Sequence, residues 1–264
     1  HSGRRAAGPR TDSTPENAPA SMILLPKLGI TRNEYRETWL LEKQRAWLEA
    51  QDRNRSGIHA SSLLDLRMSY WDQIDPQLLT GKQIGLFVIG KVLHSFILAA
   101  VNPKHNEFSA DSGTKHAEGI SYSPDWSDNG VPVEAKTNRS PNAPHEHKLQ
   151  DELYLYLEQL VIYMVLENSL KGELWVYYIN LREASGRTYP EPRCYVVEMP
   201  QQQLDELRQQ VFELRDLLQE AIATRNPAHL ELCRSWKCGD QCPHWSRCQP
   251  PGRFPNLDKK RWVI

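Results

Sequence analysis

The chain has 264 residues, of which 39% are hydrophobic and 25% are charged, and its formal net charge is −1. A chain of this size and composition can bury a core without disulfides, so wholly disordered, collagen-like and coiled-coil architectures are excluded. The most apolar stretch, residues 84–101, contains Lys91 and His94. We interpret it as a buried helix rather than a membrane span.

Residues 1–21 begin with His-Ser-Gly, which is typical of a tag remnant, and continue as a polar, Pro-rich segment. Such a segment buries too little apolar surface to fold, so we expect a disordered tail. It lacks the apolar centre of a secretory signal. We therefore expect a cytoplasmic protein.

Charge and cysteine are distributed unevenly along the chain. Residues 225–264 contain eight Lys and Arg against three Asp and Glu, so this end is basic while the rest is acidic. The same segment holds four of the five cysteines, Cys233, Cys238, Cys242 and Cys248. The composition therefore predicts a domain over residues 22–224 and a basic four-cysteine module over residues 225–264 that packs on it.

The first half of the domain has the apolar spacing of helices. Thr31 followed by Glu34 is typical of a capping box and predicts a helix that ends near Gln51. A second helix is expected from about Ser61 through Tyr70, and a third over about residues 82–100.

The second half alternates strands with helices. Residues 119–126 and 131–137 are expected to be strands joined by a turn at Asn129-Gly130. The remaining expected elements are a helix over about residues 149–168, strands over residues 173–181 and 193–199, and a helix over residues 201–223. This order predicts an α/β or α+β domain. We expect Cys194, in the last strand, to be a buried small apolar side chain.

The register of the expected hairpin brings two acids together. A two-residue turn at Asn129-Gly130 places Asp125 directly across from Glu134. Facing carboxylates destabilise a sheet, and a divalent cation such as Mg²⁺, which prefers oxygen ligands, would compensate. Lys136 shares the face of Glu134, because side chains alternate along a strand, and can orient a metal-bound water or take its proton. The three residues predict a hydrolytic site.

The structural alternative is an ordinary solvated strand face, on which charge pairs are common and contribute little. Pro124 favours the site, because it cannot donate a ladder hydrogen bond and strand pairing should end where Asp125 lies.

Two helical pairs add further candidates. Gly90 lies one turn before His94, which leaves room beside His94 for a backbone or a ligand. On a later helix Gln159 and Tyr163 are four residues apart, and Tyr156 precedes them on the same face. Taken singly, His94 and both tyrosines are interpreted as core side chains.

Taken in order, these motifs resemble a known family. Gly90-x-x-x-His94, Gly119 leading into Pro124-Asp125, Glu134-Ala135-Lys136 and Gln159-x-x-x-Tyr163 resemble the PD-(D/E)XK nuclease superfamily, and specifically its RecB-like branch. The resemblance spans residues 90–163. It implies a restriction-endonuclease-like core with a small mixed sheet flanked by helices.

The resemblance also implies roles for individual residues. It implies that Mg²⁺ or Mn²⁺ is bound by His94, Asp125, Glu134 and the backbone carbonyl of Ala135. Lys136 would be the catalytic lysine, acting with the two acids. Gln159, Tyr163 and Tyr156 would contact substrate or support the site.

The four clustered cysteines are separated by four, three and five residues, and such crowding in an intracellular chain argues for metal binding rather than disulfides. The spacing leaves open an iron–sulfur cluster, a structural Zn²⁺ and free thiols. The last three cysteines resemble the C-terminal triplet of iron–sulfur RecB-like nucleases, such as the CRISPR-associated exonucleases and exonuclease V, which implies a [4Fe-4S] cluster. Those families commonly take a fourth ligand from a cysteine before the Gly-x-x-x-His helix, whereas here Cys233 would supply it and the cluster would hold only the tail. His229 and His244 are nearby spare ligands.

Basic residues in the same module are interleaved with Trp236, Trp245 and Trp262, a composition that suits single-stranded nucleic acid. The resemblance implies a metal-dependent deoxyribonuclease, and the likeness to the iron–sulfur nucleases implies an exonuclease on single-stranded DNA ends, of 5′→3′ polarity, active in recombination, repair or CRISPR adaptation. A helicase or an adaptation-complex protein is the expected partner. The alternatives are a structure-specific endonuclease using the same site and a non-catalytic DNA-binding subunit.

Overall fold

The computed structural model describes residues 34–52, 57–78, 80–101, 113–145, 148–183, 185–231 and 244–248. The expected disordered tail and three of the four clustered cysteines lie outside these ranges, while Cys248 lies within them. The expected division into two units is therefore untested and stays a prediction.

The described strands form two small sheets. The larger sheet has the order β4-β5-β6-β7, with β5 parallel to β6 and the other pairs antiparallel. Its strands are β4 (Trp126–Asp128), β5 (Val131–Asn138), β6 (Lys171–Arg182) and β7 (Thr188–Glu198). The smaller sheet has the order β1-β3-β2 and consists of β1 (Ile58–His59), β3 (Ile120–Tyr122) and β2 (Lys115–Ala117).

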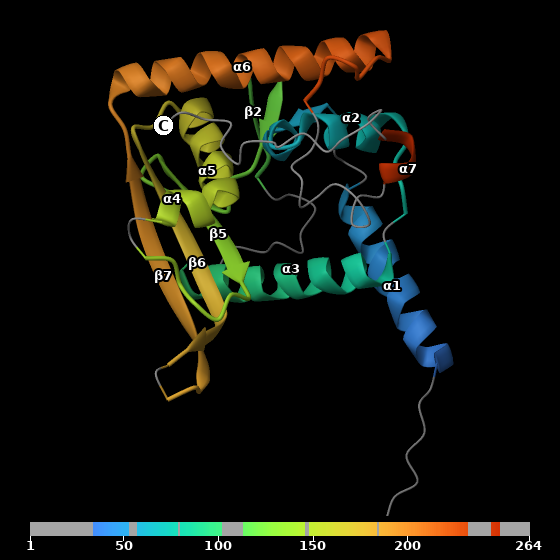
Figure 1. Cartoon of the computed structure of the whole chain (residues 1–264), viewed down its shortest axis with the longest axis vertical. Coiled ribbons are helices and arrows are strands. Elements are labelled where there is room, and N and C mark those ends of the chain that lie inside the picture. Colours follow the sequence, from blue (N-terminus) through green and yellow to red (C-terminus); the bar gives the residue numbers. More distant parts are fainter. Residues whose placement is uncertain are drawn as a thin grey trace, which may run out of the picture.

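Helices flank these sheets (Figure 1). α5 packs on β5 and β6, α6 packs on α5 and α2, and α3 contacts both β5 and α1. The helices are α1 (Glu34–Asp52), α2 (Leu66–Ile74), α3 (Gly81–Val101), α4 (Leu149–Glu152), α5 (Tyr154–Glu167), α6 (Gln201–Thr224) and α7 (Trp245–Cys248), with a 3₁₀ turn, η1, at Ala60–Leu63. The expected mixed α/β class, with a small mixed sheet flanked by helices, is confirmed.

The core lies between α5, the larger sheet and α6. Alternate residues of β6 are buried, so one face of the strand points at α5. Leu174, Val176 and Tyr178 on that face are almost fully buried, as are Leu160 and Met164 of α5. Each such apolar side chain contributes about 1.5–3 kcal/mol when it leaves water. At the start of β6 the helix lies so close that a Cβ at Gly172 would meet Met164 Sδ at 2.8 Å.

The sequence predicted the larger elements more accurately than the smaller ones. The strand expected over residues 119–126 is divided into β3 and β4, which belong to different sheets and are separated at Pro124. The short strands β1 and β2 were not expected. The helix expected over residues 149–168 is interrupted at Leu153 between α4 and α5.

Two expectations at the edge strand β7 were wrong. β7 begins at Thr188 rather than Arg193, although it contains Pro190 and Pro192, because an edge strand tolerates residues that donate no ladder hydrogen bond. Cys194 is exposed rather than buried. It lies opposite Trp175 on an edge strand.

Within the described ranges, no helix combines the length and the apolar character that crossing a membrane requires.

Candidate active site

The hairpin formed by β4 and β5 has the expected register. Asn129 and Gly130 have φ values of 50° and 83°, as a two-residue turn with both central residues in the left-handed region requires. Trp126 pairs with Val133, and this is the last pair of the ladder before Pro124-Asp125. Asp125 therefore lies just beyond the end of β4, where the expectation from Pro124 placed it.

Asp125 connects the hairpin to α3. The backbone N–H of Ala135 donates a hydrogen bond of 2.6 Å to Asp125 Oδ2, and His94 Nε2 of α3 lies 2.9 Å from the same oxygen. Burial opposes ionisation of Asp125, but His94, Lys136 and the Ala135 amide outweigh it and hold the pKa of Asp125 below its usual range. Asp125 is therefore a carboxylate held in a fixed position.

Glu134 and Lys136 form an ion pair on the face of β5 that α5 covers. Glu134 pairs with Leu174 and Lys136 with Val176, two core residues of β6, so the acid has an apolar neighbour. Glu134 is fully buried and the Lys136 ammonium contacts its carboxylate. The expectation that both side chains share one face is confirmed, and the alternative of a solvated face does not hold for Glu134.

The buried pair has perturbed acidities. Burial, together with the charge of Asp125, raises the pKa of Glu134 to about 8, although Lys136 opposes this shift. Burial lowers the pKa of Lys136, but the charges of Glu134 and Asp125 outweigh it and raise the pKa above its ordinary value. Lys136 is therefore an ammonium at neutral pH, and Glu134 is an acid that can exchange a proton there.

The three candidate residues of α5, Tyr156, Gln159 and Tyr163, make different interactions. Burial raises the pKa of Tyr156, and the charge of Lys136 opposes the shift. Gln159 Nε2 donates a hydrogen bond of 2.7 Å to Tyr163 Oη. Tyr163 is buried and packs against Tyr122, with ring centroids 6.3 Å apart. The expected roles of Tyr156, Gln159 and Tyr163 in contacting substrate or supporting the site all stay predictions.

Gly90 opens space on α3 one turn before His94. A Cβ built at Gly90 would meet no heavy atom of the described residues within 4 Å. The room expected beside His94 is therefore present.

The donor set matches a divalent cation in its chemistry. In the conformation of the described residues, no three His, Cys, Asp or Glu side chains are grouped so as to hold a metal ion. Nevertheless, Glu134 Oε2 is buried and has no hydrogen-bond partner in the described part of the chain. A buried carboxylate oxygen of this kind is costly, and a cation beside it would remove the cost. Two carboxylates and one imidazole suit Mg²⁺ or Mn²⁺.

The sequence did not predict the hydrogen bond between the Ala135 backbone and Asp125. The backbone group of Ala135 that is engaged at the site is its N–H, which binds Asp125, whereas the expectation concerned its carbonyl as a metal ligand. Only the hairpin register, extended by one residue past the ladder, could have indicated this contact. The carbonyl role stays a prediction.

Comparisons with known proteins give distant structural likenesses. No family model and no curated protein matches the chain. Among solved structures, the chain is similar to a phage-related exonuclease from Haemophilus somnus 129PT, with 11% identity and a TM-score of 0.45 over 67% of this chain and 100% of the other. It is also similar to an alkaline exonuclease from Laribacter hongkongensis, with 14% identity and a TM-score of 0.42 over 68% of this chain and 95% of the other. Because both likenesses are distant, the site is interpreted from its own side chains.

Proposed function

We propose that the chain is a metal-dependent deoxyribonuclease of the PD-(D/E)XK superfamily, in its RecB-like branch. The observation that supports this proposal is the meeting of Asp125, Glu134, Lys136 and His94 at the end of one hairpin. Two acids and an ammonium that are held together and largely shielded from water are the groups that phosphodiester hydrolysis needs.

Each residue of the proposed site has a role that follows from its charge. His94, Asp125 and Glu134 would hold Mg²⁺ or Mn²⁺, which supplies Lewis-acid polarisation of the phosphate when bound. Lys136, fixed as an ammonium by the two acids, donates hydrogen bonds to a phosphate oxygen or to the attacking water. Glu134 would bind the cation as a carboxylate, so it would release the proton that its raised pKa retains in the metal-free chain, and the proton of the attacking water would pass through solvent to the leaving 3′ oxygen.

Hydrolysis of a phosphodiester forms one bond to phosphorus and breaks another. The water oxygen bonds to phosphorus as the bond from phosphorus to the 3′ oxygen breaks, which leaves a 5′-phosphate and a 3′-hydroxyl. Tyr156, whose pKa the charge of Lys136 affects, would position the substrate backbone. Gln159 and Tyr163 would support this arrangement from the next turns of α5.

The preferred substrate is single-stranded DNA with a free end, degraded with 5′→3′ polarity. This part of the proposal rests on the resemblance of the motifs and on the basic, Trp-containing composition of residues 225–264. A helicase or an adaptation-complex protein would supply the unwound strand in recombination, repair or CRISPR adaptation.

The experiment compares linear and circular DNA. The purified chain is incubated with end-labelled single-stranded DNA, duplex DNA and circular single-stranded DNA, with Mg²⁺, with Mn²⁺ or with EDTA. We expect metal-dependent release of short products from linear single strands and no cleavage of circles. Asp125→Ala should abolish the activity, while Asp216→Ala, at an exposed acid of α6, should leave it unchanged.

The other outcomes are equally clear. Cleavage of circles would establish the endonuclease instead of the exonuclease. Equal activity of the native chain and Asp125→Ala would mean a contaminating nuclease and would overturn the site. Binding of DNA without any cleavage would establish the non-catalytic DNA-binding subunit.

A further inference from the structure

One row of residues across the larger sheet has a cation at each end. Lys136 of β5 pairs with Val176 of β6, and Val176 pairs with Arg193 of β7. Residues directly opposite each other on neighbouring strands point to the same face, so Lys136 and Arg193 extend from one face on either side of the buried Val176. Two strand spacings separate their Cα atoms by roughly 10 Å. A second positive charge therefore lies beside the proposed active site.

Arg193 uses one of its three guanidinium nitrogens within the described part of the chain. Its Nε donates a hydrogen bond of 3.0 Å to Glu191 Oε1, which orients the guanidinium, whereas Nη1 and Nη2 have no partner among the described residues. The side chain of Arg193 is 42% exposed and that of Lys136 is 29% exposed, so a ligand in solution can reach both. The paired N–H donors of a guanidinium match the oxygens of a phosphate.

Two tyrosine hydroxyls next to Arg193 are buried and unsatisfied. Tyr195 lies two residues from Arg193 on the same face of β7, and Tyr178 lies diagonally across from Arg193, opposite Glu191. Neither Oη has a partner at hydrogen-bond geometry in the described part of the chain. Burial raises the pKa of Tyr178; the Tyr195 hydroxyl adds to the shift, and the charge of Arg193 opposes it. An unpaired hydroxyl costs about 1–3 kcal/mol, and an anionic acceptor would remove that cost.

We propose that Arg193 and the Tyr195 hydroxyl bind a phosphate of the DNA backbone next to the phosphodiester on which Lys136 acts. This inference rests on the proposed function, because Lys136 marks the bond that is cleaved. Tyr178 is fully buried, so its hydroxyl orients that of Tyr195, whose partly buried side chain is the one a strand can reach. Since Lys and Arg side chains are long, the two cations reach successive phosphates of one strand and fix it relative to the cleaved bond.

The test measures DNA binding in EDTA, where no metal-dependent cleavage occurs, by fluorescence anisotropy with a short fluorescent single-stranded oligothymidine. Arg193→Ala should weaken binding about 10–100-fold, because it removes charge-assisted hydrogen bonds to a phosphate. Tyr195→Phe should weaken binding about 2–10-fold, because it removes a neutral donor and keeps the ring. Arg193→Ala breaks only a partly exposed ion pair, so the variant keeps its fold.

Arg208→Ala is the matched control for these variants. Arg208 also forms a partly exposed ion pair with a nearby acid, Asp205, but it lies on α6 rather than on the sheet. Its removal should leave the affinity for the oligonucleotide unchanged.

A change in the DNA tests whether the contact is to a phosphate. Each phosphate of the oligonucleotide is replaced in turn by a neutral methylphosphonate. At one position, the replacement should weaken binding to the native chain and weaken binding to Arg193→Ala no further, because both changes remove the same interaction. Additive losses at every position, equal affinity of Arg193→Ala and the native chain, or no binding by the native chain would each overturn the proposal.

Cleavage measured separately in Mn²⁺ distinguishes this inference from the nuclease proposal. Arg193→Ala should raise the DNA concentration needed for half-maximal cleavage more than it lowers the rate at saturating DNA. A chain that binds DNA through Arg193 but cleaves none would overturn the nuclease and keep the phosphate contact. A chain that cleaves DNA but binds it equally well without Arg193 would do the reverse.

Discussion

At the scale of single residues, Glu134 has a raised pKa because it is buried beside the charge of Asp125. Its folded-state pKa of about 8 lies above the ordinary value of 4.5, so the folded chain keeps a proton that the unfolded chain loses. The stabilisation from that proton is fully present below pH 4.5 and is lost as the pH rises towards about 8. The loss is at most about 1.4 kcal/mol per pH unit.

The substitution Glu134→Gln removes this titration. In metal-free buffer, the variant should gain stability relative to the native chain as the pH rises from 4.5 to about 8, with little difference below that range. Urea unfolding at a series of pH values measures the difference. Glu198→Gln, at the end of the edge strand β7, controls for the loss of one negative charge. A native-to-variant difference that is independent of pH would contradict the burial of a proton-binding Glu134.

At the scale of elements, the turn of the hairpin sets the position of Asp125. Gly130 has a φ of 83°, which an L-residue adopts only with strain, although in the described part of the chain a Cβ there would meet no heavy atom within 4 Å. Gly130→Ala should therefore destabilise the chain by about 1 kcal/mol through backbone strain alone. DNA cleavage should fall as well, since the turn fixes the register that presents Asp125 to Ala135 and His94.

Gly90→Ala is the matched control for this turn. It also places a Cβ in open space but lies inside α3, where alanine is favoured by about 0.5–1 kcal/mol. Thermal unfolding of both variants should therefore shift in opposite directions. A Gly130→Ala variant as stable as Gly90→Ala would show that the turn is not held in the left-handed region.

Elements with a strong local signal were predictable from the sequence. The Asn-Gly turn predicted the hairpin register, and the apolar spacing of residues 201–223 predicted α6, which extends from Gln201 to Thr224. The short strands β1 and β2 have no such signal, because their pairing depends on β3 rather than on their own residues. The split of the expected strand at Pro124 was foreseen as a loss of pairing but not as a change of sheet.

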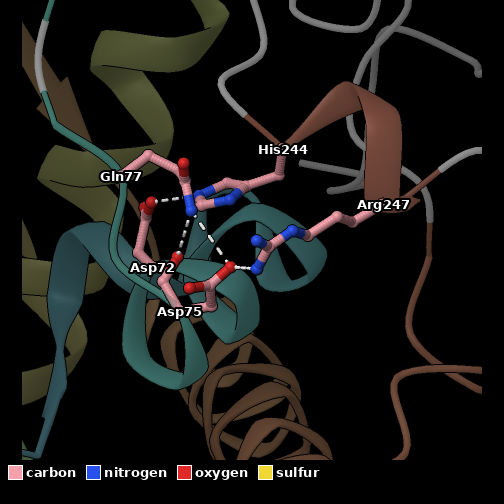
Figure 2. Close-up of polar contacts among 5 residues, drawn as sticks. All are labelled: Asp72, Asp75, Gln77, His244 and Arg247. Atoms are coloured by element: carbon pink, nitrogen blue, oxygen red, sulfur yellow. Dashed lines mark hydrogen bonds and ion pairs between the residues drawn. The ribbon is translucent and has the colours of Figure 1, made fainter.

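At the scale of the whole molecule, contacts between residues far apart in the sequence could not be predicted from local patterns. His94 was a candidate only through its motif, and α3 brings it to Asp125 across the hairpin end. The pairing of His244 with Asp72 joins residues 172 positions apart, and an exposed acid on a helix gives no sign of such a partner. Spacing therefore predicted the residues of the proposed site better than the attachment of residues 244–248 to α2 (Figure 2).

Arg67 provides a separate test of how α2 joins the C-terminal part of the chain. Its guanidinium Nη2 donates to the carbonyls of Pro227, at 2.6 Å, and Ala228, at 3.2 Å, just after α6. Arg67→Ala removes both bonds and should destabilise the chain by about 1–3 kcal/mol, measured by urea unfolding.

Arg193→Ala, which breaks a partly exposed ion pair with Glu191 on β7, is the control and should change the stability by less than about 1 kcal/mol. Equal effects of the two variants would mean that the Arg67 contacts do not hold α2 to the segment after α6.

The most direct test of the proposed site is the single-turnover rate at which the chain cleaves end-labelled single-stranded DNA in Mn²⁺. Lys136→Ala should reduce this rate by about 10²–10⁴-fold, because it removes the ammonium beside the reacting phosphate. Lys171→Ala, on the neighbouring strand β6, should stay within about twofold of the native rate. Equal rates for Lys136→Ala and the native chain would contradict a hydrolytic site at the end of the hairpin.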